Sequence, residues 1–235
     1  MKNLKVFTVG LAFLTAVGSF SSCATKQGTG SLIGAGGGAA LGAVIGALAG
    51  NTVVGAAIGT AVGTGAGVII GKKMDKAKKE AEAVQNAQVE SVKDSNGLDA
   101  VKVTFDSGIL FTTGSSTLSA TAKNSLTQFS TVLKNNADCD VAVQGYTDNA
   151  GWKNSTAEQS QQKNLNLSQQ RAQAVTDYLL SLGVSSNQIR STMGYGESNP
   201  VADNSTAAGK AQNRRVEVYL YASQAMIQAA EQQAN

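Results

Sequence analysis

Four short segments in the second half of the chain place apolar side chains at every second position, the period of a strand with one buried face. These segments are residues 100–105, 140–146, 189–195 and 215–221. Two longer segments, 119–133 and 168–182, repeat apolar residues at helical spacing behind a serine suited to an N-cap. A short apolar piece, Ile109-Leu110-Phe111, adds a second small strand. The pattern predicts an α/β (α+β) two-layer sandwich, β-α-β-α-β-β, with its helices on one face of the sheet.

A glycine-rich region precedes this domain. From Ser31 to Gly71 there is no charged residue, and glycine recurs at every fourth position in two runs, broken at Asn51-Thr52. On a helix this period makes a stripe that lets another helix approach closely. Each run is long enough to cross a hydrocarbon core of about 30 Å. We predict a helical hairpin, Ser31–Gly50 and Val53–Gly71, that resembles glycine-zipper segments; the alternative is a flexible glycine/alanine linker, which the regular repeat and bulky apolar residues disfavour.

A polar segment connects the two regions. Residues 72–96 begin with five closely spaced lysines and continue with alanine, glutamate and glutamine, which favours an exposed helix. We interpret it as a connector helix that leads to a domain over residues 97–222. Residues 223–235 form an alanine- and glutamine-rich tail that favours a helix.

The chain begins with a targeting pattern. In residues 1–22, Lys2 and Lys5 precede an apolar run from Val6 to Val17, which has the length of a signal peptide and is too short to span a bilayer comfortably. Small residues then precede Cys23, a pattern that resembles a bacterial lipobox with Phe20 in place of the usual leucine. In this interpretation Cys23 is the lipidated first residue of the mature protein, and residues 23–30 form a spacer. The alternative is an ordinary signal peptide followed by an incidental cysteine.

Composition narrows the classes of function. The net charge of +3, with no basic patch beyond the lysines at 72–79, gives no support to a nucleic-acid partner. The absence of histidine removes the commonest general base and the commonest zinc ligand, so we predict no metal and no cofactor. Cys139 stands beside Val141 and Val143, where a small buried strand residue is expected rather than a reactive thiol or a disulfide.

Polar motifs follow the predicted elements and place one carboxylate, Asp148, and one guanidinium, Arg171, where a fold brings them together. Such a pair suits a small zwitterion. The motifs are, in order, Gly145-Tyr-Thr-Asp-Asn-Ala-Gly151, Asn164-x-x-Leu-Ser-x-x-Arg171-Ala172, Gly194-Tyr-Gly-Glu197-x-x-Pro200 and Asn213-Arg-Arg-Val-Glu217. Together they resemble the OmpA-like C-terminal domain, which also occurs in peptidoglycan-associated lipoproteins and motility stators. With the lipobox and the glycine-rich segment, the chain resembles OmpA-family outer-membrane lipoproteins that carry a glycine zipper.

The resemblance implies non-covalent binding of peptidoglycan through the diaminopimelate of its stem peptide. It assigns the ligand's ammonium to Asp148 and its carboxylate to Arg171. The residues that it implies around this pair are Thr147, Asn149 and Asn164, which orient it, and Thr112 and Thr113, which line the same pocket. Of Arg214 and Arg215, one supports the pocket and the other faces solvent; the motif does not decide between them, and we take Arg215 as the pocket residue.

The chain departs from the family pattern between Gly151 and Asn164. The intervening residues 152–163 make this connection longer than in the best-known members. The added loop either covers the pocket or contacts glycan, with Trp152 as a stacking residue, or it is a tolerated polar surface insertion. The polar composition of residues 152–163 favours the second interpretation, a tolerated surface insertion.

The resulting hypothesis is a non-enzymatic protein that tethers the outer membrane of a Gram-negative bacterium to its cell wall. Its partners are peptidoglycan, through the periplasmic domain, and the membrane, through lipidated Cys23 with or without the hairpin. A homo-oligomer is left open. A second hypothesis, an enzyme of the cell wall, has no support, because the chain contains no histidine and no paired-carboxylate motif. A membrane-inserting glycine-zipper pore or envelope-stress protein, with the domain as its anchor, is the alternative function.

Overall fold

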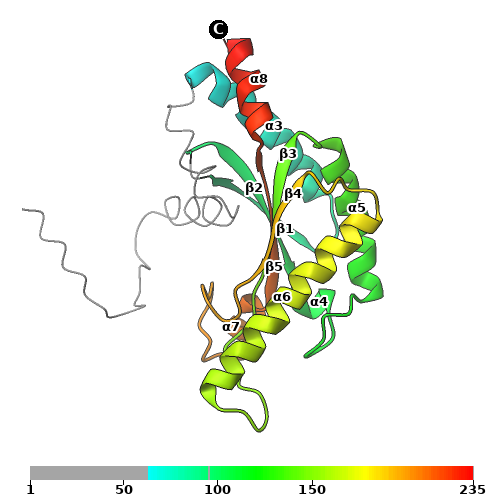
Figure 1. Ribbon diagram of the computed structural model, residues 1–235, viewed down its shortest axis with the longest axis vertical. Helices are drawn as coiled ribbons and strands as arrows, with labels where there is room; N and C mark the ends of the chain where they lie inside the picture. Colours follow the sequence, from blue (N-terminus) through cyan, green and yellow to red (C-terminus); the bar gives the residue numbers. More distant parts are fainter. Residues whose placement is uncertain (1–62, 95, 235) are drawn as a thin grey trace, which may run out of the picture. The chain divides into compact units, whose positions relative to one another are not determined.

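The computed structural model describes residues 63–94 and 96–234 (Figure 1). The predicted signal peptide, the lipidation site at Cys23 and the spacer lie outside these residues, as does all but the end of the predicted hairpin. No helix in the described part of the chain is both long enough and apolar enough to cross a membrane.

Five strands form one mixed sheet in the order β1-β2-β5-β3-β4. Strands β3 and β4 are parallel, and every other neighbouring pair is antiparallel. The strands are β1 (Ala87–Lys93), β2 (Asp99–Asp106), β3 (Cys139–Gly145), β4 (Ile189–Gly194) and β5 (Arg215–Ala222). Four of them match the four predicted strands to within one residue at each end, because each has the alternation of a strand with one face in the core.

Helices cover one face of this sheet, as the sequence predicts (Figure 1). The helices of the described part of the chain are α3 (Thr64–Glu82), α4 (Ser107–Leu110), α5 (Ala120–Asn135), α6 (Ala157–Ser181), α7 (Ala207–Asn213) and α8 (Gln224–Ala234). The inward residues of the strands share one apolar core with α3, α5, α6 and α8. In its centre Phe105 of β2 meets Phe129 of α5 edge to face, with the ring centroids 5.6 Å apart. The two-layer α/β fold is therefore confirmed.

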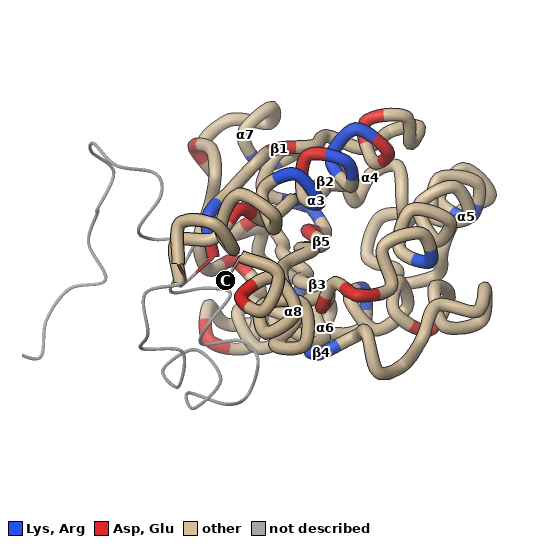
Figure 2. The backbone as a smooth tube through the Cα atoms, turned by 90° about the horizontal axis from the view of Figure 1, so that it is seen from above, with Lys and Arg blue, Asp and Glu red and all other residues tan. Residues whose placement is uncertain are grey.

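The connector predicted over residues 72–96 is only partly a helix and is not an exposed spacer. Helix α3 runs without a break across Gly71, and its buried side packs against the sheet and α8. That side comprises Ala66, Ile70, Met74, Ala77 and Ala81. This apolar stripe is hard to recognise in the sequence because lysines stand between its positions. The lysines are interspersed with acidic residues along the helix (Figure 2). Lys76 and Lys78 each face a glutamate four residues later, a pairing that supports a helix.

Residues 87–93 of that predicted connector are a strand, β1, which pairs antiparallel with β2. A tight turn joins the two strands; Asp94 Oδ1 accepts hydrogen bonds from the amides of Asn96 and Leu98, and Gly97 has a φ of +76°. Helical propensity is overridden here because pairing at a sheet edge satisfies the backbone.

The domain also extends beyond the predicted end at residue 222. The tail is helix α8, which packs on α3 through Met226, Ile227 and Ala230. The folded unit thus includes Thr64 to Ala234 rather than residues 97–222 alone.

Two further local predictions are wrong. Residues 109–111 do not form a second strand; they close the short helix α4, and Phe111 makes one isolated bridge to Leu118. Helix α6 does not begin at Ser168 but at Ala157, where Thr156 and Gln159 form a capping box. Much of the added segment between Gly151 and Asn164 is therefore helix and not loop.

Cys139 is a buried, free thiol at the start of β3, in agreement with the sequence. Burial, and then the nearby Asp138, raises the pKa of this thiol to about 12. The reactive thiolate is therefore scarce at neutral pH.

Candidate functional site

A cavity of about 600 Å³ opens at one end of the sheet, where the segments after β2 and β3 meet α6, α7 and the residue just before β5. Its lining comes from separate parts of the sequence: Ser107, Gly108, Phe111, Thr113, Gly114, Thr147, Asp148, Ala150, Gly151, Trp152, Lys153, Asn164, Leu167, Arg171, Lys210 and Arg214. The segment 147–153 after β3 supplies more of it than any other loop.

Two glycines bring α6 close enough to complete this cavity. A Cβ on Gly145, at the end of β3, would lie 2.2 Å from the Ser168 carbonyl oxygen. A Cβ on Gly194, at the end of β4, would lie 2.1 Å from the Gln169 backbone nitrogen. Any larger residue would push the helix away. Arg171 follows Ser168 by three positions, so the same close approach places its side chain at the cavity.

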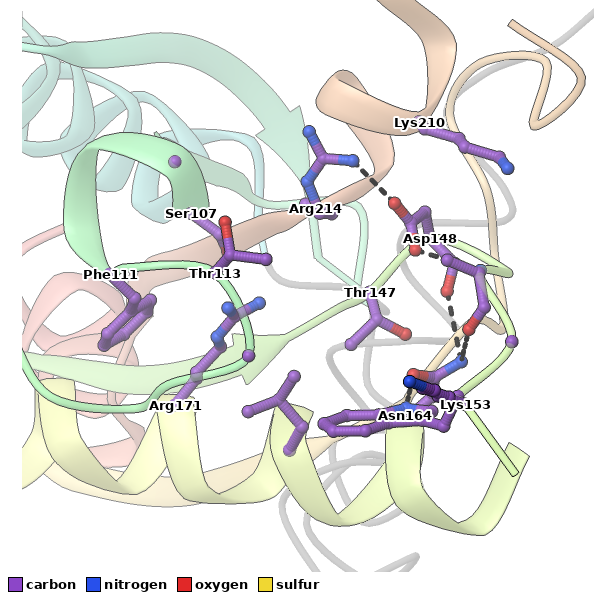
Figure 3. A pocket seen from close by; sticks show the side chains of 16 residues that line it. Ser107, Phe111, Thr113, Thr147, Asp148, Lys153, Asn164, Arg171, Lys210 and Arg214 are labelled. Atoms are coloured by element: carbon purple, nitrogen blue, oxygen red, sulfur yellow. Dashed lines mark hydrogen bonds and ion pairs between the residues drawn. The ribbon is translucent and has the colours of Figure 1, made fainter. Parts of the chain in front are cut away.

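Asp148 is buried and has two partners. Its Oδ2 accepts a hydrogen bond of 2.6 Å from Arg214 Nη1, and its Oδ1 accepts one of 3.0 Å from the Ala150 amide (Figure 3). The second contact is an Asx turn that fixes the loop. The carboxylate is thus held in place at the cavity wall by one guanidinium and one amide.

Arg171 enters the same cavity from α6 and is 4% exposed. Its Nε donates to the Ser115 carbonyl at 3.0 Å, and its guanidinium lies 5.1 Å from the centroid of the Phe111 ring. Burial lowers the pKa of Arg171 and the neighbouring charge of Arg214 lowers it further, while Asp148 acts in the opposite direction. Within the described part of the chain, only its Nε makes a hydrogen bond, so the two Nη groups remain for a ligand.

Two hydroxyl groups at the cavity have no hydrogen-bond partner among the described residues. They belong to Thr147, 5% exposed, and to Ser107, 1% exposed. Leaving a buried hydroxyl unpaired costs about 1–3 kcal/mol. Both residues line the cavity, and both hydroxyls are unused donors there.

Asn164 holds the loop rather than facing open space. Its Nδ2 donates to the carbonyls of Asp148 and Ala150, at 3.4 and 3.2 Å, and to Glu197 Oε2 at 3.1 Å. Its Oδ1 accepts a hydrogen bond of 2.7 Å from Trp152 Nε1. One amide therefore joins three segments around the cavity.

Of the eight ligand-binding residues predicted from the sequence, the structure brings five together at the cavity and leaves three out. The five are Asp148, Arg171, Thr147, Asn164 and Thr113. Asn149 and Thr112 are exposed and do not line it.

Arg215 does not line the cavity, and the prediction that named it is wrong; Arg214 lines it instead. Val216 faces the core, so the neighbouring Arg215 lies on the opposite face of the sheet. There its Nε donates to Glu217 at 2.7 Å, and its guanidinium lies 3.9 Å from the centroid of the Tyr146 ring.

The sequence predictions also missed Ser107, Phe111, Lys153 and Lys210, which line the cavity. Arg214 belongs to the last motif and Lys210 precedes it by a few residues, so their position in the sequence could have indicated that they line the site. Ser107 and Phe111 had none, because only the turn into α4 directs them to the cavity. Charges, hydroxyls and an apolar wall in one cavity suit the binding of a charged small group; the described residues contain no cluster of His, Cys, Asp or Glu that could hold a metal ion.

The chain is similar to several known proteins. The chain is 42% identical over 122 residues to "Probable lipoprotein YiaD" of Escherichia coli K12, which is 52% of each chain. It is 45% identical over 86 residues to "Peptidoglycan-binding protein ArfA" of Mycobacterium tuberculosis, covering 37% of this chain and 24% of that one. The chain thus spans about half, or less, of these two relatives' length.

Among solved structures, the cell wall anchor of the T6SS from Pseudomonas aeruginosa is similar, with a TM-score of 0.51 and 27% identity over 64% of this chain and 97% of that one. Residues 1–75 match the YMGG-like Gly-zipper family and residues 110–214 match the OmpA family. The OmpA-family match thus includes most of the residues that line the cavity.

Proposed function

We propose that the domain binds peptidoglycan without modifying it, through the free amino-acid centre of diaminopimelate in the stem peptide. The ligand's ammonium contacts Asp148, and its carboxylate contacts the Nη groups of Arg171. Thr147 and Ser107 supply hydroxyl groups to the same ligand. The protein acts as a tether, with no catalytic step.

One observation carries this proposal: a fixed carboxylate and a guanidinium with unused donors face one cavity, beside two unpartnered hydroxyls. Burial and Arg214 both disfavour the charge on Arg171, so a carboxylate there restores favourable electrostatics. Arginine offers a planar fork that matches a carboxylate. The names of the relatives support the same ligand class, since one is called a peptidoglycan-binding protein and one structure is a cell wall anchor.

The tether is completed at the N-terminus. Lipidated Cys23, at the end of the signal peptide over residues 1–22, anchors the protein in the outer membrane with its domain in the periplasm. The similarity to a protein named as a lipoprotein and to the Gly-zipper family supports this arrangement. An alternative function, in which the glycine-rich hairpin itself inserts into the membrane, is supported by the regular glycine repeat between residues 31 and 71.

Sedimentation with purified peptidoglycan tests the binding. Full-length Asp148→Asn and Arg171→Gln proteins are expected to stay in the supernatant, while Lys79→Ala, which removes an exposed charge of α3 outside the cavity, pellets like wild type. Free diaminopimelate should release bound wild-type protein. If both cavity variants pellet like wild type, this site does not bind peptidoglycan.

Membrane extraction tests the anchor. A Cys23→Ala protein should leave the membrane fraction at alkaline pH and carry no radiolabelled palmitate. Retention of this variant after alkaline extraction would contradict the lipid as sole anchor and would favour insertion of the hairpin.

A further inference from the structure

The charges around the cavity are unequal. Four cationic side chains line it, Lys153, Arg171, Lys210 and Arg214, against the carboxylate of Asp148. That carboxylate is already paired with Arg214. A single zwitterion adds one positive and one negative charge, so it leaves the excess of positive charge unchanged.

Among the described residues, the two lysines have no counter-charge. Neither Lys153 nor Lys210 forms an ion pair or a side-chain hydrogen bond with any described residue. Figure 3 places both on the Asp148 side of the cavity, away from Arg171 and Phe111; in this view Lys210 lies above Asp148 and Lys153 below it. The cavity therefore has a second cationic end, which flanks Asp148 and is separate from the Arg171 end.

Trp152 forms an apolar wall beside this second end. Its Nε1 donates to Asn164 at 2.7 Å, its amide donates to Ser160 Oγ at 3.0 Å, and Lys163 Nζ lies 5.9 Å from the ring centroid. Ser160 and Lys163 belong to the first turns of α6, within the segment that lengthens this connection. The added residues thus hold Trp152 in a fixed orientation.

We propose that this end of the cavity is a second subsite, in which Lys153 and Lys210 bind a second carboxylate of the ligand while its apolar stem lies against Trp152. The proposal rests on the proposed function, since it extends the same ligand. In a stem peptide two groups have this chemistry: the other carboxylate of diaminopimelate, in a tripeptide, and the terminal carboxylate of an alanine joined to it, in a tetrapeptide.

Calorimetric titration of the full-length protein tests this with two pairs of muropeptide stems: the tripeptide and its terminal amide, and the tetrapeptide and its terminal amide. Wild type should bind one acid about tenfold more tightly than its amide. The pair that shows the difference identifies the source of the carboxylate. Raising the ionic strength should reduce the preference, because these lysines are accessible to solvent.

The Lys153→Ala/Lys210→Ala protein should bind acid and amide within about twofold of each other, while the Lys79→Ala control keeps the wild-type preference. Equal binding of acid and amide by wild type, or a preference that persists in the double variant, overturns the second subsite. If Arg171→Gln loses binding while wild type binds acid and amide equally, the second subsite is wrong and the proposed function stands. If Arg171→Gln and Asp148→Asn both still bind the stem peptide, the proposed function is wrong as well.

Discussion

Two adjacent arginines, Arg214 just before β5 and Arg215 at its start, enter two regions of opposite character. Arg214 points into the cavity, where it pairs with Asp148, and where Arg171 and two hydroxyls keep unused hydrogen-bonding capacity. Arg215 points to the other face of the sheet, where the Glu217 carboxylate accepts from both Arg215 and Tyr219. The guanidinium nitrogens of Arg215 are all engaged on one face of the sheet, whereas the two Nη groups of Arg171 stay unpaired among the described residues on the other. A buried polar cluster that satisfies itself stabilises the fold, whereas one left incomplete is available to a ligand.

The largest effect is expected from Arg215→Ala, which should lower the free energy of unfolding by about 3–5 kcal/mol, because it leaves the Glu217 charge buried without its partner. Urea unfolding measures it. Arg190→Ala, which breaks the partly exposed pair with Asp140, should cost less than about 1 kcal/mol. Equal losses in the two variants would remove the distinction between the fully buried pair and the partly exposed one.

Arg171→Gln should reverse the pattern. Binding of the diaminopimelate-containing tripeptide should weaken by about 100-fold, because two charge-assisted hydrogen bonds are lost. Stability should change little, since burial and Arg214 already disfavour the charge, as its lowered pKa records. Calorimetric titration and urea unfolding of the same sample measure both quantities. A stability loss as large as that of Arg215→Ala would make Arg171 a structural residue.

Thr147→Val should move binding and stability in opposite directions. Valine has nearly the same shape and removes an unpartnered hydroxyl, so stability should stay constant or rise by up to about 1 kcal/mol. Ligand affinity should fall about fivefold, because the ligand loses one hydrogen bond. Parallel losses of both would mean that the hydroxyl serves the fold and not the ligand. Thr113→Val is the matched control, because it makes the same substitution at a more exposed position of the same cavity.

The smallest effect concerns Asp94, a buried carboxylate in the β1–β2 turn that belongs to neither region. Burial raises its pKa in the folded state, against the opposing effect of its hydrogen bonds to Leu98 and Asn96. Between the unfolded and the folded pKa the native state binds more protons, so its contribution to stability falls as pH rises through that window. Asp94→Asn should therefore be more favourable relative to wild type at pH 7 than at pH 3. Urea unfolding at both values checks the sign, and the opposite order would contradict it.

The sequence alone determined the strands and helix starts that depend on short-range patterns of apolar residues and caps. Strand alternation located four of the five strands, and the Ser119 cap located the start of α5, because these depend on short-range periodicity and capping. The ordered motifs also brought Asp148 and Arg171 to one cavity, since glycines at positions 145 and 194 let α6 approach the strand ends.

Only the tertiary structure decided features that depend on what packs against a residue. The buried stripe of α3 has apolar partners on the sheet that its lysines conceal, and β1 becomes a strand because β2 is there to pair with it. The choice between Arg214 and Arg215 follows from the face on which Val216 lies. The unpartnered hydroxyls and the second cationic end exist only where distant segments meet, because unused hydrogen-bonding capacity and uncompensated charge are properties of an assembled cavity and not of any one stretch of chain.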